Sequence, residues 1–313
     1  MAVGMMPISV EIVFWTLAVL ILYVYGGYPL LLLGLSRLRP ARRVRKGDVT
    51  PTVSLIIPAY NEEKVIEDKL RNSLALDYPK DRLQIIVASD GSIDSTDDVA
   101  RKYETAEVKL VALDRNQGKS AAENAAVTRA SGEVLFFSDA NVMLRPDALR
   151  RAVANFADSN VGCVVGQVTY VNHRATTVSE GEGIYWRYEL FLRRKESELG
   201  NLAMGSGPIM AIRRSLFSPL DARVGEDFVL PMQVALKGYR IVYEPTAVSE
   251  EVLFQNTPGS MFNSKVRIIS KDLRGLLQCR SILNPFCHPL YAWGLTSHKI
   301  LRWLVPYFLL PLF

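Results

Sequence analysis

The feature that most constrains the fold is an alternation of strand-like and helix-like segments between residues 52 and 156. Four short apolar runs are each followed by an amphipathic or alanine-rich stretch. The apolar runs are Val53–Ile57, Leu83–Ala88, Val108–Leu113 and Val134–Phe137. Strands that alternate with helices of about 10–15 residues are typical of βαβ units and of a mostly parallel sheet. We therefore predict an α/β fold whose parallel strands end at a common edge.

Further elements of both kinds are predicted along the chain. Helices are expected over 62–76, 94–103, 118–130 and 146–156, each after one of the four strands. Beyond them we predict strands over 161–171, 208–212 and 240–243, and helices over 178–199, 225–237 and 260–277. This architecture is common among nucleotide-binding proteins, although a fold alone assigns no function.

A long uncharged segment, Ile12–Ser36, precedes the alternating region. As a helix it would span roughly 37 Å, enough to cross a hydrocarbon core of ~30 Å with some tilt. A kink is expected at Gly26, Gly27 and Pro29. Positive charge follows this segment rather than preceding it, which distinguishes it from a cleaved signal peptide. By the positive-inside rule we predict a transmembrane anchor over 1–36 in the plasma or inner membrane, with the rest of the chain on the cytoplasmic side.

Residues 37–50 form a basic linker that accounts for the net charge of +5. Its positive side chains within ten positions are Arg37, Arg39, Arg42, Arg43, Arg45 and Lys46. Without these six, the chain has 31 basic against 32 acidic side chains, so it is nearly neutral. Aromatic residues do not interleave with the basic ones, and we predict no nucleic-acid partner.

The cysteines and histidines show no metal-ligand or disulfide pattern. Cys163, Cys279 and Cys287 are odd in number and lack C-x-x-C spacing, which favours reduced thiols in a cytosolic compartment. The three histidines are not spaced as ligands, and we interpret them as structural or interfacial.

The C-terminal region, 259–313, is predicted to associate with the membrane. Residues 260–277 place basic side chains among apolar ones, as in a helix that lies in a membrane interface, although an ordinary surface helix has the same pattern. Ile300–Phe313 is apolar but, at fourteen residues, too short to span a bilayer. We expect it to be re-entrant, interfacial or the start of a longer membrane helix. The α/β domain would then cover 51–258 on the cytoplasmic side.

Four loops that follow the predicted strands carry polar side chains that a fold does not need for its core. They are Pro58–Glu63, Ser89–Thr96, Asn116–Lys119 and Ser138–Asn141. In a parallel sheet all four would lie at one edge, where ligands bind in open α/β sheets. Carboxylates there could bond to a ribose or base, and Lys119 near a helix start could meet a phosphate.

Each loop also has a purely structural interpretation. Asn61 and Asp94 could be helix N-caps, and Gly91 could simply make a turn. Gly118 and Lys119 lack the upstream glycine of a Walker A loop, and no G-x-G-x-x-G follows the first strand. The occurrence of four such loops at one edge nevertheless favours a binding site.

Asp139 and Asn141 directly follow the fourth apolar run. Two oxygen-bearing side chains two positions apart could hold one divalent cation, with substrate phosphate completing its coordination. Alternatively, one of them caps the next helix.

Taken together, these loops resemble those of the family 2 inverting glycosyltransferases, which have a GT-A fold and use nucleotide-activated sugars. The resemblance covers roughly residues 50–280, includes Gly205–Arg213 and Gly225–Asp227, and is to membrane-bound members that act on polysaccharides or lipid-linked glycans. The matching motifs are PAYNE at Ile56–Glu63, DGSxDxT at Ser89–Thr96, NxGKxxALN at Asn116–Asn124 with Glu123 in place of Leu, and the D-x-D metal site at Ser138–Asn141.

The resemblance implies a role for each matching residue. Asp227 would be the general base that deprotonates the acceptor hydroxyl, so that direct displacement inverts the anomeric carbon. Asp139 and Asn141 would bind Mg²⁺ or Mn²⁺. The nucleotide-sugar would contact Pro58, Ala59, Tyr60, Glu62, Asp90, Gly91, Lys119, Ser138 and Asp139. Glu226, Arg267 and Trp186 would lie near the acceptor or diphosphate, although for Trp186 a core or interface position is favoured over stacking on a sugar.

Two positions depart from the family pattern. Asn141 stands where many members have a second Asp, and a neutral amide coordinates a cation more weakly. Processive members carry Q-x-x-R-W, whereas this chain has Ser264–Ile268, in which only Arg267 matches. The absent Trp would stack on the acceptor sugar, so processivity is left open.

The predicted function is transfer of a sugar from a nucleotide-diphospho-sugar, with UDP favoured, to a glycan or lipid-linked acceptor. One alternative is a polyprenyl-phosphate sugar synthase, and another is a non-catalytic membrane subunit that binds nucleotide-sugar. Membrane lipid is an expected partner, and the oligomeric state is left open.

Overall fold

A computed structural model describes residues 8–38, 43–105, 107–171, 177–200, 202, 204–252 and 258–312. The chain divides into two compact units. The sheet unit comprises Arg43–Arg187 and Met204–Ser281, and the helical unit comprises Met1–Arg42, Tyr188–Ala203 and Ile282–Phe313. The chain passes from one unit to the other after Arg42, after Arg187 within a long helix, after Ala203 and after Ser281.

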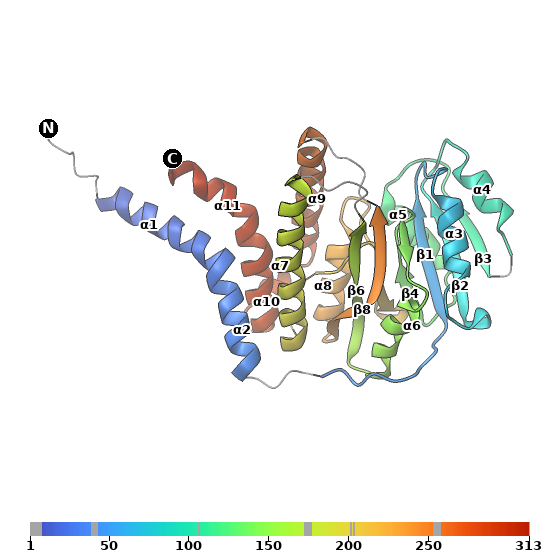
Figure 1. Cartoon of the computed structure of the whole chain (residues 1–313), viewed down its shortest axis with the longest axis horizontal. Coiled ribbons are helices and arrows are strands. Elements are labelled where there is room, and N and C mark those ends of the chain that lie inside the picture. The colour runs from blue at the N-terminus through green and yellow to red at the C-terminus, as the bar shows by residue number, and fades with distance from the viewer. Residues whose placement is uncertain are drawn as a thin grey trace. The chain divides into compact units, whose positions relative to one another are not determined.

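The sheet unit contains one eight-stranded sheet in the order β3-β2-β1-β4-β7-β6-β8-β5 (Figure 1). The strands β3, β2, β1 and β4 are parallel to one another, and β6 and β8 also pair in parallel. β7 pairs antiparallel with β4 and β6, and β5 pairs antiparallel with β8. The strands are β1 Val53–Ala59, β2 Leu83–Ser89, β3 Val108–Ala112, β4 Val134–Phe137, β5 Val142–Leu144, β6 Val161–Val171, β7 Met210–Arg213 and β8 Arg240–Val252.

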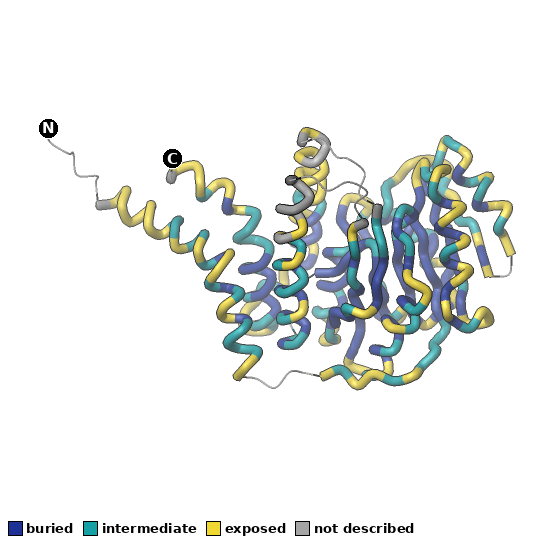
Figure 2. The backbone as a smooth tube through the Cα atoms, viewed as in Figure 1, coloured by how far each residue is buried: buried dark blue, intermediate teal, exposed yellow. Residues whose placement is uncertain are grey.

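Helices cover both faces of the sheet. Because strand side chains alternate, Leu55 and Ile57 of β1 face one way and Ile56 faces the other. Leu55 and Ile57 share a buried apolar cluster with α3, α4 and α6, while α5 contacts β1, β2 and β3 through buried alanines outside that cluster. Figure 2 shows the buried backbone concentrated in the strands. The helices are α3 Ile66–Leu74, α4 Thr96–Lys102, α5 Lys119–Arg129, α6 Ala148–Val153, α8 Glu226–Leu236 and α9 Pro258–Gln278.

Three sequence expectations about elements were wrong or incomplete. The last strand was predicted to end at Tyr243, but β8 continues to Val252. Pro245 cannot donate to a ladder, and the structure absorbs it in an irregularity between the pairs Val165–Tyr243 and Gln167–Val248. β5 was not predicted because three residues carry too little periodicity. The helix expected from residue 62 begins at Ile66.

The helical unit is built from two interrupted helices and the end of a third. α1 (Ile8–Leu22) continues through a π-helical turn, Tyr23–Gly27, into α2 (Tyr28–Leu38). α10 (Pro289–Leu295) continues through a second π-helical turn, Thr296–Ile300, into α11 (Leu301–Leu309). The unit also contains the second half of α7 (Thr177–Leu199). The kink expected near Gly26 takes the form of the first π turn.

Polar groups are buried inside the helical unit. His298 Nδ1 lies 2.7 Å from Glu196 Oε1, and its Nε2 lies 3.1 Å from Glu189 Oε2. Tyr28 donates to Glu196, and Arg302 pairs with Glu189. Each buried charge therefore has a partner, as burial requires.

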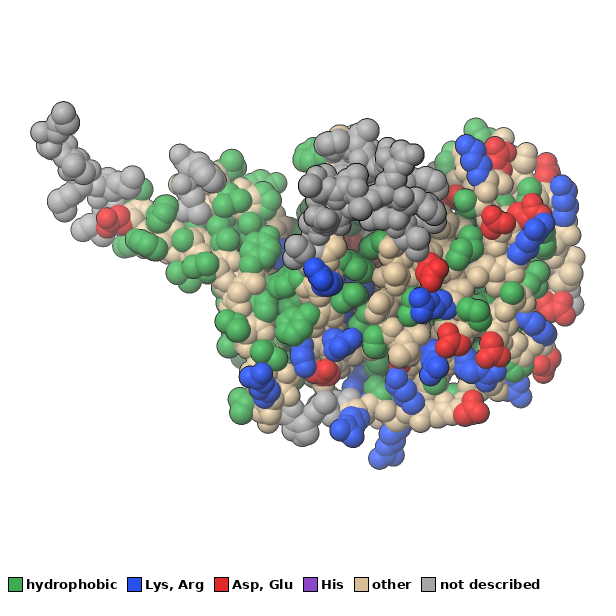
Figure 3. Space-filling view, viewed as in Figure 1, with side chains coloured by type: hydrophobic (Ala, Val, Ile, Leu, Met, Phe, Trp, Pro, Cys, Tyr) green, Lys and Arg blue, Asp and Glu red, His purple; other side chains and the backbone are tan. Residues whose placement is uncertain are grey.

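Ser9–Leu38 is, among the described residues, the helix that is long and apolar enough to cross a membrane. Many of its side chains are exposed, and hydrophobic atoms gather over α1 (Figures 2 and 3). Length and composition alone support this assignment.

Candidate functional site

The loops that follow β1, β2 and β4 meet at the carboxyl edge of the sheet, as the parallel pairing requires. Asp90 N donates to Ala59 O over 2.9 Å, which links the first two loops. The Asp90 carboxylate accepts from Gln117 N at 2.7 Å and Gly118 N at 2.8 Å, which ties in the loop before α5. Asp90 thus holds two loops together, and this structural task occupies one acceptor site on each of its oxygens.

The loop after β1 is shaped by local hydrogen bonds. Asn61 has a φ of 56°, a left-handed conformation that asparagine tolerates, and its Oδ1 accepts from Ile93 N at 2.9 Å. Because α3 begins only at Ile66 and Asn61 Oδ1 bonds to Ile93, Asn61 does not cap this helix, as one interpretation of the sequence had suggested. Glu62 N donates to Thr96 Oγ1 at 2.8 Å. Tyr60 is 44% exposed at this edge, where a flat ring could lie against a nucleotide base. Pro58 and Ala59 form the buried end of β1.

Gly91 is required by geometry. Its φ is +68°, and a Cβ atom there would lie 2.4 Å from the carbonyl carbon of Arg115. Any other residue would push apart the loops that follow β2 and β3.

Lys119, at the first position of α5, lies between two carboxylates. Its Nζ is 2.5 Å from Asp139 Oδ1 and 2.5 Å from Glu226 Oε1. Although burial opposes the charge, Asp139 and Glu226 hold the pKa of Lys119 well above its usual value. Three elements distant in sequence, the end of β4 and the starts of α5 and α8, therefore converge on one ammonium group.

The segment Gly205–Gly207 packs directly against this ion-pair cluster. A Cβ at Gly207 would lie 3.2 Å from Glu226 Oε1, 3.6 Å from Lys119 Nζ and 3.7 Å from Asp139 Oδ2. A Cβ at Gly205 would lie 2.5 Å from Asp227 O. The glycines thus allow the backbone to approach the charged side chains closely.

Glu226 and Asp227 open α8, where the helix dipole favours negative charge. Glu226 is buried against Lys119, whereas Asp227 is only half-buried. Asp227 O accepts from Gly205 N at 2.8 Å, which fixes the start of the helix. A half-buried carboxylate beside the cluster is placed to accept a proton from a ligand hydroxyl.

Glu123 is a further acidic group at the cluster. Neither of its carboxyl oxygens has a hydrogen-bond partner among the described residues, and the residue is fully buried. Burial, reinforced by Glu226, raises the pKa of Glu123 well above its usual range even though Lys119 opposes the shift. Glu123, the residue that departs from the family motif, is therefore a buried acid beside the ion-pair cluster whose surroundings favour its neutral form.

Asn141 and Asp139 offer two different oxygen donors. Asn141 Nδ2 donates to Glu251 Oε1 over 3.3 Å, which leaves the amide oxygen of Asn141 as the atom that could face a cation. No group of three His, Cys, Asp or Glu side chains able to hold a metal occurs within the described residues. One carboxylate and one amide fit a hard cation that takes its remaining ligands from water and substrate phosphates, as Mg²⁺ and Mn²⁺ do.

Trp186 and Arg267 were both expected to lie near the acceptor or diphosphate. Trp186 Nε1 donates to Val168 O at 3.2 Å, its ring meets Tyr170 edge-on at 5.2 Å, and it packs against the core cluster. Arg267 is an exposed residue of α9. The structure therefore brings neither into contact with Lys119 or Asp139, and their roles remain predictions.

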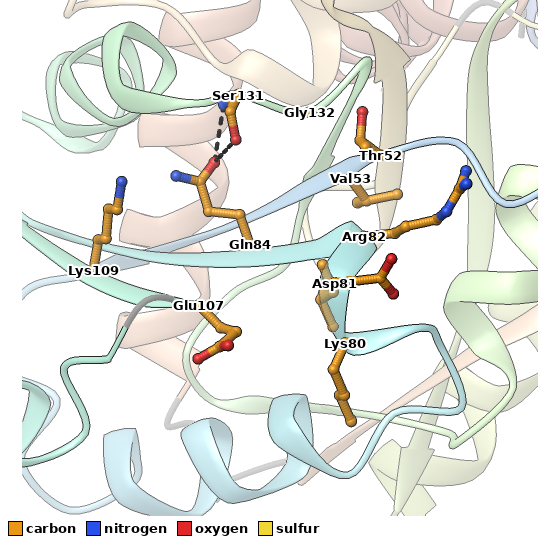
Figure 4. A pocket seen from close by; sticks show the side chains of 11 residues that line it. Thr52, Val53, Lys80, Asp81, Arg82, Gln84, Glu107, Lys109, Ser131 and Gly132 are labelled. Atoms are coloured by element: carbon orange, nitrogen blue, oxygen red, sulfur yellow. Dashed lines mark hydrogen bonds between the residues drawn. The ribbon is translucent and has the colours of Figure 1, made fainter.

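A cavity of about 270 Å³ lies at the opposite edge of the sheet (Figure 4). It is lined by residues that precede or begin strands, including Thr52, Leu83, Glu107 and Gly132. In open α/β sheets ligands bind at the carboxyl ends of the strands, whereas this cavity lies at their amino ends. We therefore do not assign it to the site.

Sequence reasoning missed Lys69 and Glu251. Lys69 is buried beneath the Asp139 loop, and Glu251 contacts Asn141 from β8. The signal for Glu251 lay beyond the predicted end of its strand. Lys69 lies among apolar residues of a predicted helix, and the sequence alone does not tell whether such a lysine is buried.

Residues 54–220 match the family model described as Glycosyl transferase family 2. An N-acetylglucosaminyltransferase of Mesorhizobium japonicum (strain LMG 29417 / CECT 9101 / MAFF 303099) is 30% identical over 76% of this chain and 60% of its own length. A poly-beta-1,6-N-acetyl-D-glucosamine synthase of Staphylococcus aureus (strain COL) is 28% identical over 69% of this chain and 53% of its own. The chain thus spans little more than half the length of these relatives.

Among solved structures, a mannosyltransferase from Pyrobaculum calidifontis, in complex with GDP-Man and Mn²⁺, has a TM-score of 0.67. It is 23% identical and covers 95% of this chain and 90% of its own. This likeness concerns the fold, and it confirms the predicted α/β, GT-A architecture.

Proposed function

Because the chain belongs to glycosyl transferase family 2, we propose that it transfers a sugar from a nucleotide-diphospho-sugar, in the first instance a UDP-sugar, to an acceptor hydroxyl. The acceptor class we propose is a glycan or a lipid-linked glycan. Relatives named as N-acetylglucosaminyltransferase and poly-N-acetylglucosamine synthase support this choice. GDP-sugars also belong among the donors to be tested, since a structural neighbour is complexed with GDP-Man.

The observation that carries the proposal is the convergence of Lys119, Asp139 and Glu226 at the carboxyl edge of the sheet, with Asp227 beside them. A nucleotide at this edge would have its base near Tyr60 and Asp90 and its phosphates near Lys119. The leaving group in this reaction is a nucleoside diphosphate, whose growing negative charge has to be neutralised.

The acidic surroundings make a divalent cation a fitting partner for this site. Acidic groups outnumber the cationic ones there, and they would repel a diphosphate unless a cation bridged them. Asp139 and Asn141 are the residues that would hold Mg²⁺ or Mn²⁺. The cation would supply charge neutralisation to the leaving diphosphate.

Asp227 is proposed as the general base. As the acceptor oxygen bonds to the anomeric carbon, the bond to the diphosphate oxygen breaks on the opposite face, and the acceptor proton passes to Asp227. A single displacement of this kind inverts the anomeric centre. Glu226 is paired with Lys119, which makes its carboxylate less available to accept a proton.

The Ser9–Leu38 helix supports a membrane location for the protein. We propose that this helix anchors the chain and that the basic residues after it lie on the cytoplasmic side. Nucleotide-sugars would then reach the site from the cytoplasm.

The test is transfer and hydrolysis by the detergent-solubilised chain with a panel of UDP- and GDP-sugars, in Mn²⁺ and in EDTA. Turnover with at least one donor, lost in EDTA, is expected. Asp227→Asn should reduce turnover by about 10²–10⁴-fold while nucleotide affinity persists, because the isosteric amide cannot accept the proton.

Unchanged turnover in Asp227→Asn would remove that residue from the mechanism. A wild type that binds UDP or GDP but turns over no donor would instead support a non-catalytic nucleotide-sugar-binding subunit.

A further inference from the structure

Lys69 is a fully buried lysine in the middle of α3. It is flanked by Ile66 and Leu70, both members of the core cluster. Lysine is among the residues that are almost never buried without a partner, because removing its charge from water is costly. Burial lowers the pKa of Lys69 to about 7, with Asp139 opposing the shift. Such a residue calls for an explanation beyond helix packing.

The amine of Lys69 bonds to both ends of the candidate metal loop. Its Nζ donates to Ser138 Oγ at 2.7 Å and to Val142 O at 2.5 Å. Between these two acceptors lie only Asp139, Ala140 and Asn141. Within the described part of the chain, no carboxylate lies within ion-pair distance of Lys69. The lysine therefore spans the loop rather than neutralising an acid.

Asn72 makes a second attachment one helical turn further on. Its Nδ2 donates to Leu144 O at 2.9 Å, and its Oδ1 accepts from Leu144 N at 2.9 Å. Residues three apart on a helix face the same way, so one face of α3 contacts both the loop and the strand β5 that follows it. Reciprocal bonds to one residue fix the backbone position of Leu144.

The attachment continues through the loop to the far side of the site. Ser138 Oγ, which accepts from Lys69, donates to Pro208 O at 3.0 Å. Pro208 follows Gly207, whose backbone approaches Asp139, Glu226 and Lys119. A connected hydrogen-bond chain in a buried environment holds its members more firmly than isolated bonds do.

We propose that Lys69 and Asn72 are positioning residues that hold the Asp139–Asn141 loop in the geometry that binds the divalent cation. This inference rests on the proposed function. Outer residues that orient metal ligands commonly control metal affinity by about 10–100-fold. Lys69 and Asn72 would act on the cation site without contacting cation, nucleotide or sugar.

The experiment compares Lys69→Met and Asn72→Ala with wild type. Methionine preserves most of the side-chain volume and removes both hydrogen bonds. Mn²⁺ binding is measured by electron paramagnetic resonance with protein saturated by UDP, or by GDP if wild type binds only that nucleotide. Nucleotide affinity is measured separately in EDTA. Lys102→Met, an exposed lysine at the end of α4, is the matched control.

Both variants should bind Mn²⁺ more weakly, Lys69→Met by about 10-fold or more. Their nucleotide affinity in EDTA should stay within about twofold, because the base and ribose loops are untouched. Raising the Mn²⁺ concentration should restore turnover, a rescue that general destabilisation would not show. Lys102→Met should match wild type in every measurement.

Wild-type Mn²⁺ affinity in a folded Lys69→Met, or in Asn72→Ala should Lys69→Met fail to fold, would overturn the inference. Equal losses of Mn²⁺ and metal-free nucleotide binding would also overturn it, since the damage would then be general. Failure of the wild type itself to bind Mn²⁺ with nucleotide would contradict the proposed function, a separate result.

Discussion

At the scale of single residues, Glu123 and Lys69 are buried ionisable groups close to the residues that define the site. Glu123 lies four positions after Lys119 on α5, yet neither of its oxygens has a hydrogen-bond partner in the described structure. A buried polar group without a partner costs stability. Because Glu123 lies close to Lys119, Glu226 and Asp139, we infer that it serves the site rather than the fold.

Replacing Glu123 by leucine is expected to stabilise the protein, and more so at high pH. The pKa of Glu123 is higher in the folded protein than in the unfolded chain, where it is about 4.3. Above that pH the folded protein therefore binds more protons than the unfolded chain, and the contribution of Glu123 to stability falls as pH rises. The Glu123→Leu gain should therefore be larger at pH 8, about 1–3 kcal/mol, than at pH 5. Thermal unfolding at both pH values measures it.

Glu123→Gln is the matched control, since it keeps the shape of the side chain but cannot titrate. It should lose the pH dependence without the apolar gain of leucine. A Glu123→Leu variant that is less stable than wild type at pH 8 would show that the carboxyl group has a partner that stabilises it.

At the scale of elements, the loop between β2 and α4 has the tightest backbone constraint in the site. Gly91→Ala is expected to destabilise the protein by more than about 2 kcal/mol, because the left-handed conformation and the contact with Arg115 both oppose a Cβ atom. Since Asp90 is its neighbour, nucleotide affinity should fall as well. Thermal unfolding and nucleotide titration measure the two effects.

Gly238→Ala separates conformation from steric contact. Gly238 also has a positive φ, +83°, but no atom lies within 4 Å of its built Cβ. Its substitution should cost only about 1–2 kcal/mol and leave nucleotide affinity unchanged. Similar losses in both variants would show that the contact between Gly91 and Arg115 relaxes without cost.

Helices and strands with a clear apolar pattern could be predicted from the sequence. Elements that depend on contacts with segments far along the chain could not. The strands ending in Ala59, Ser89 and Phe137 were found because each is a compact apolar run before a polar loop. β5 exists because β8 pairs with it, and the second π turn, Thr296–Ile300, contains no glycine or proline that would mark it. No local pattern records such causes.

The site shows the same division. Asp139 could be placed because it follows a strand directly, and the acids of α8 because they open a helix. Lys69 resembles any lysine of an amphipathic helix until Ser138 and Val142 are seen against it. Glu251 became visible only when β8 proved to extend past Pro245.

At the scale of the whole molecule, the sequence combines a charged sheet unit with a helical unit that carries exposed apolar side chains. The first helix exposes Trp15, Val19 and Leu22 by 64%, 59% and 70%. Apolar surface of this extent is stable when lipid or another apolar surface covers it. Figure 3 shows hydrophobic atoms over that helix and mixed charges over the sheet unit.

The full chain is expected to stay with membranes after a carbonate wash and to need detergent for release. Substituting Trp15, Val19 and Leu22 together by Arg should abolish this behaviour, because each arginine near the centre of a bilayer costs about 2.5–3.5 kcal/mol. Ile93→Arg, at an exposed apolar residue of the sheet unit, should fractionate as wild type does. Release of the unaltered chain by carbonate alone would contradict membrane anchoring.

The pairing of β5 with β8 has a consequence for how the protein is made. Val142, directly after the Asp139–Asn141 loop, pairs with Glu251, about a hundred residues later in the chain. At synthesis rates of about 5–20 residues per second, β5 waits roughly 5 to 20 seconds for its partner strand. The pairings of β1 with β2 and of β2 with β3 need a shorter wait, since these strands are closer in sequence. A nascent chain would therefore pair β1, β2 and β3 first, and its cation loop would gain the contact with β8 only after that strand has left the ribosome.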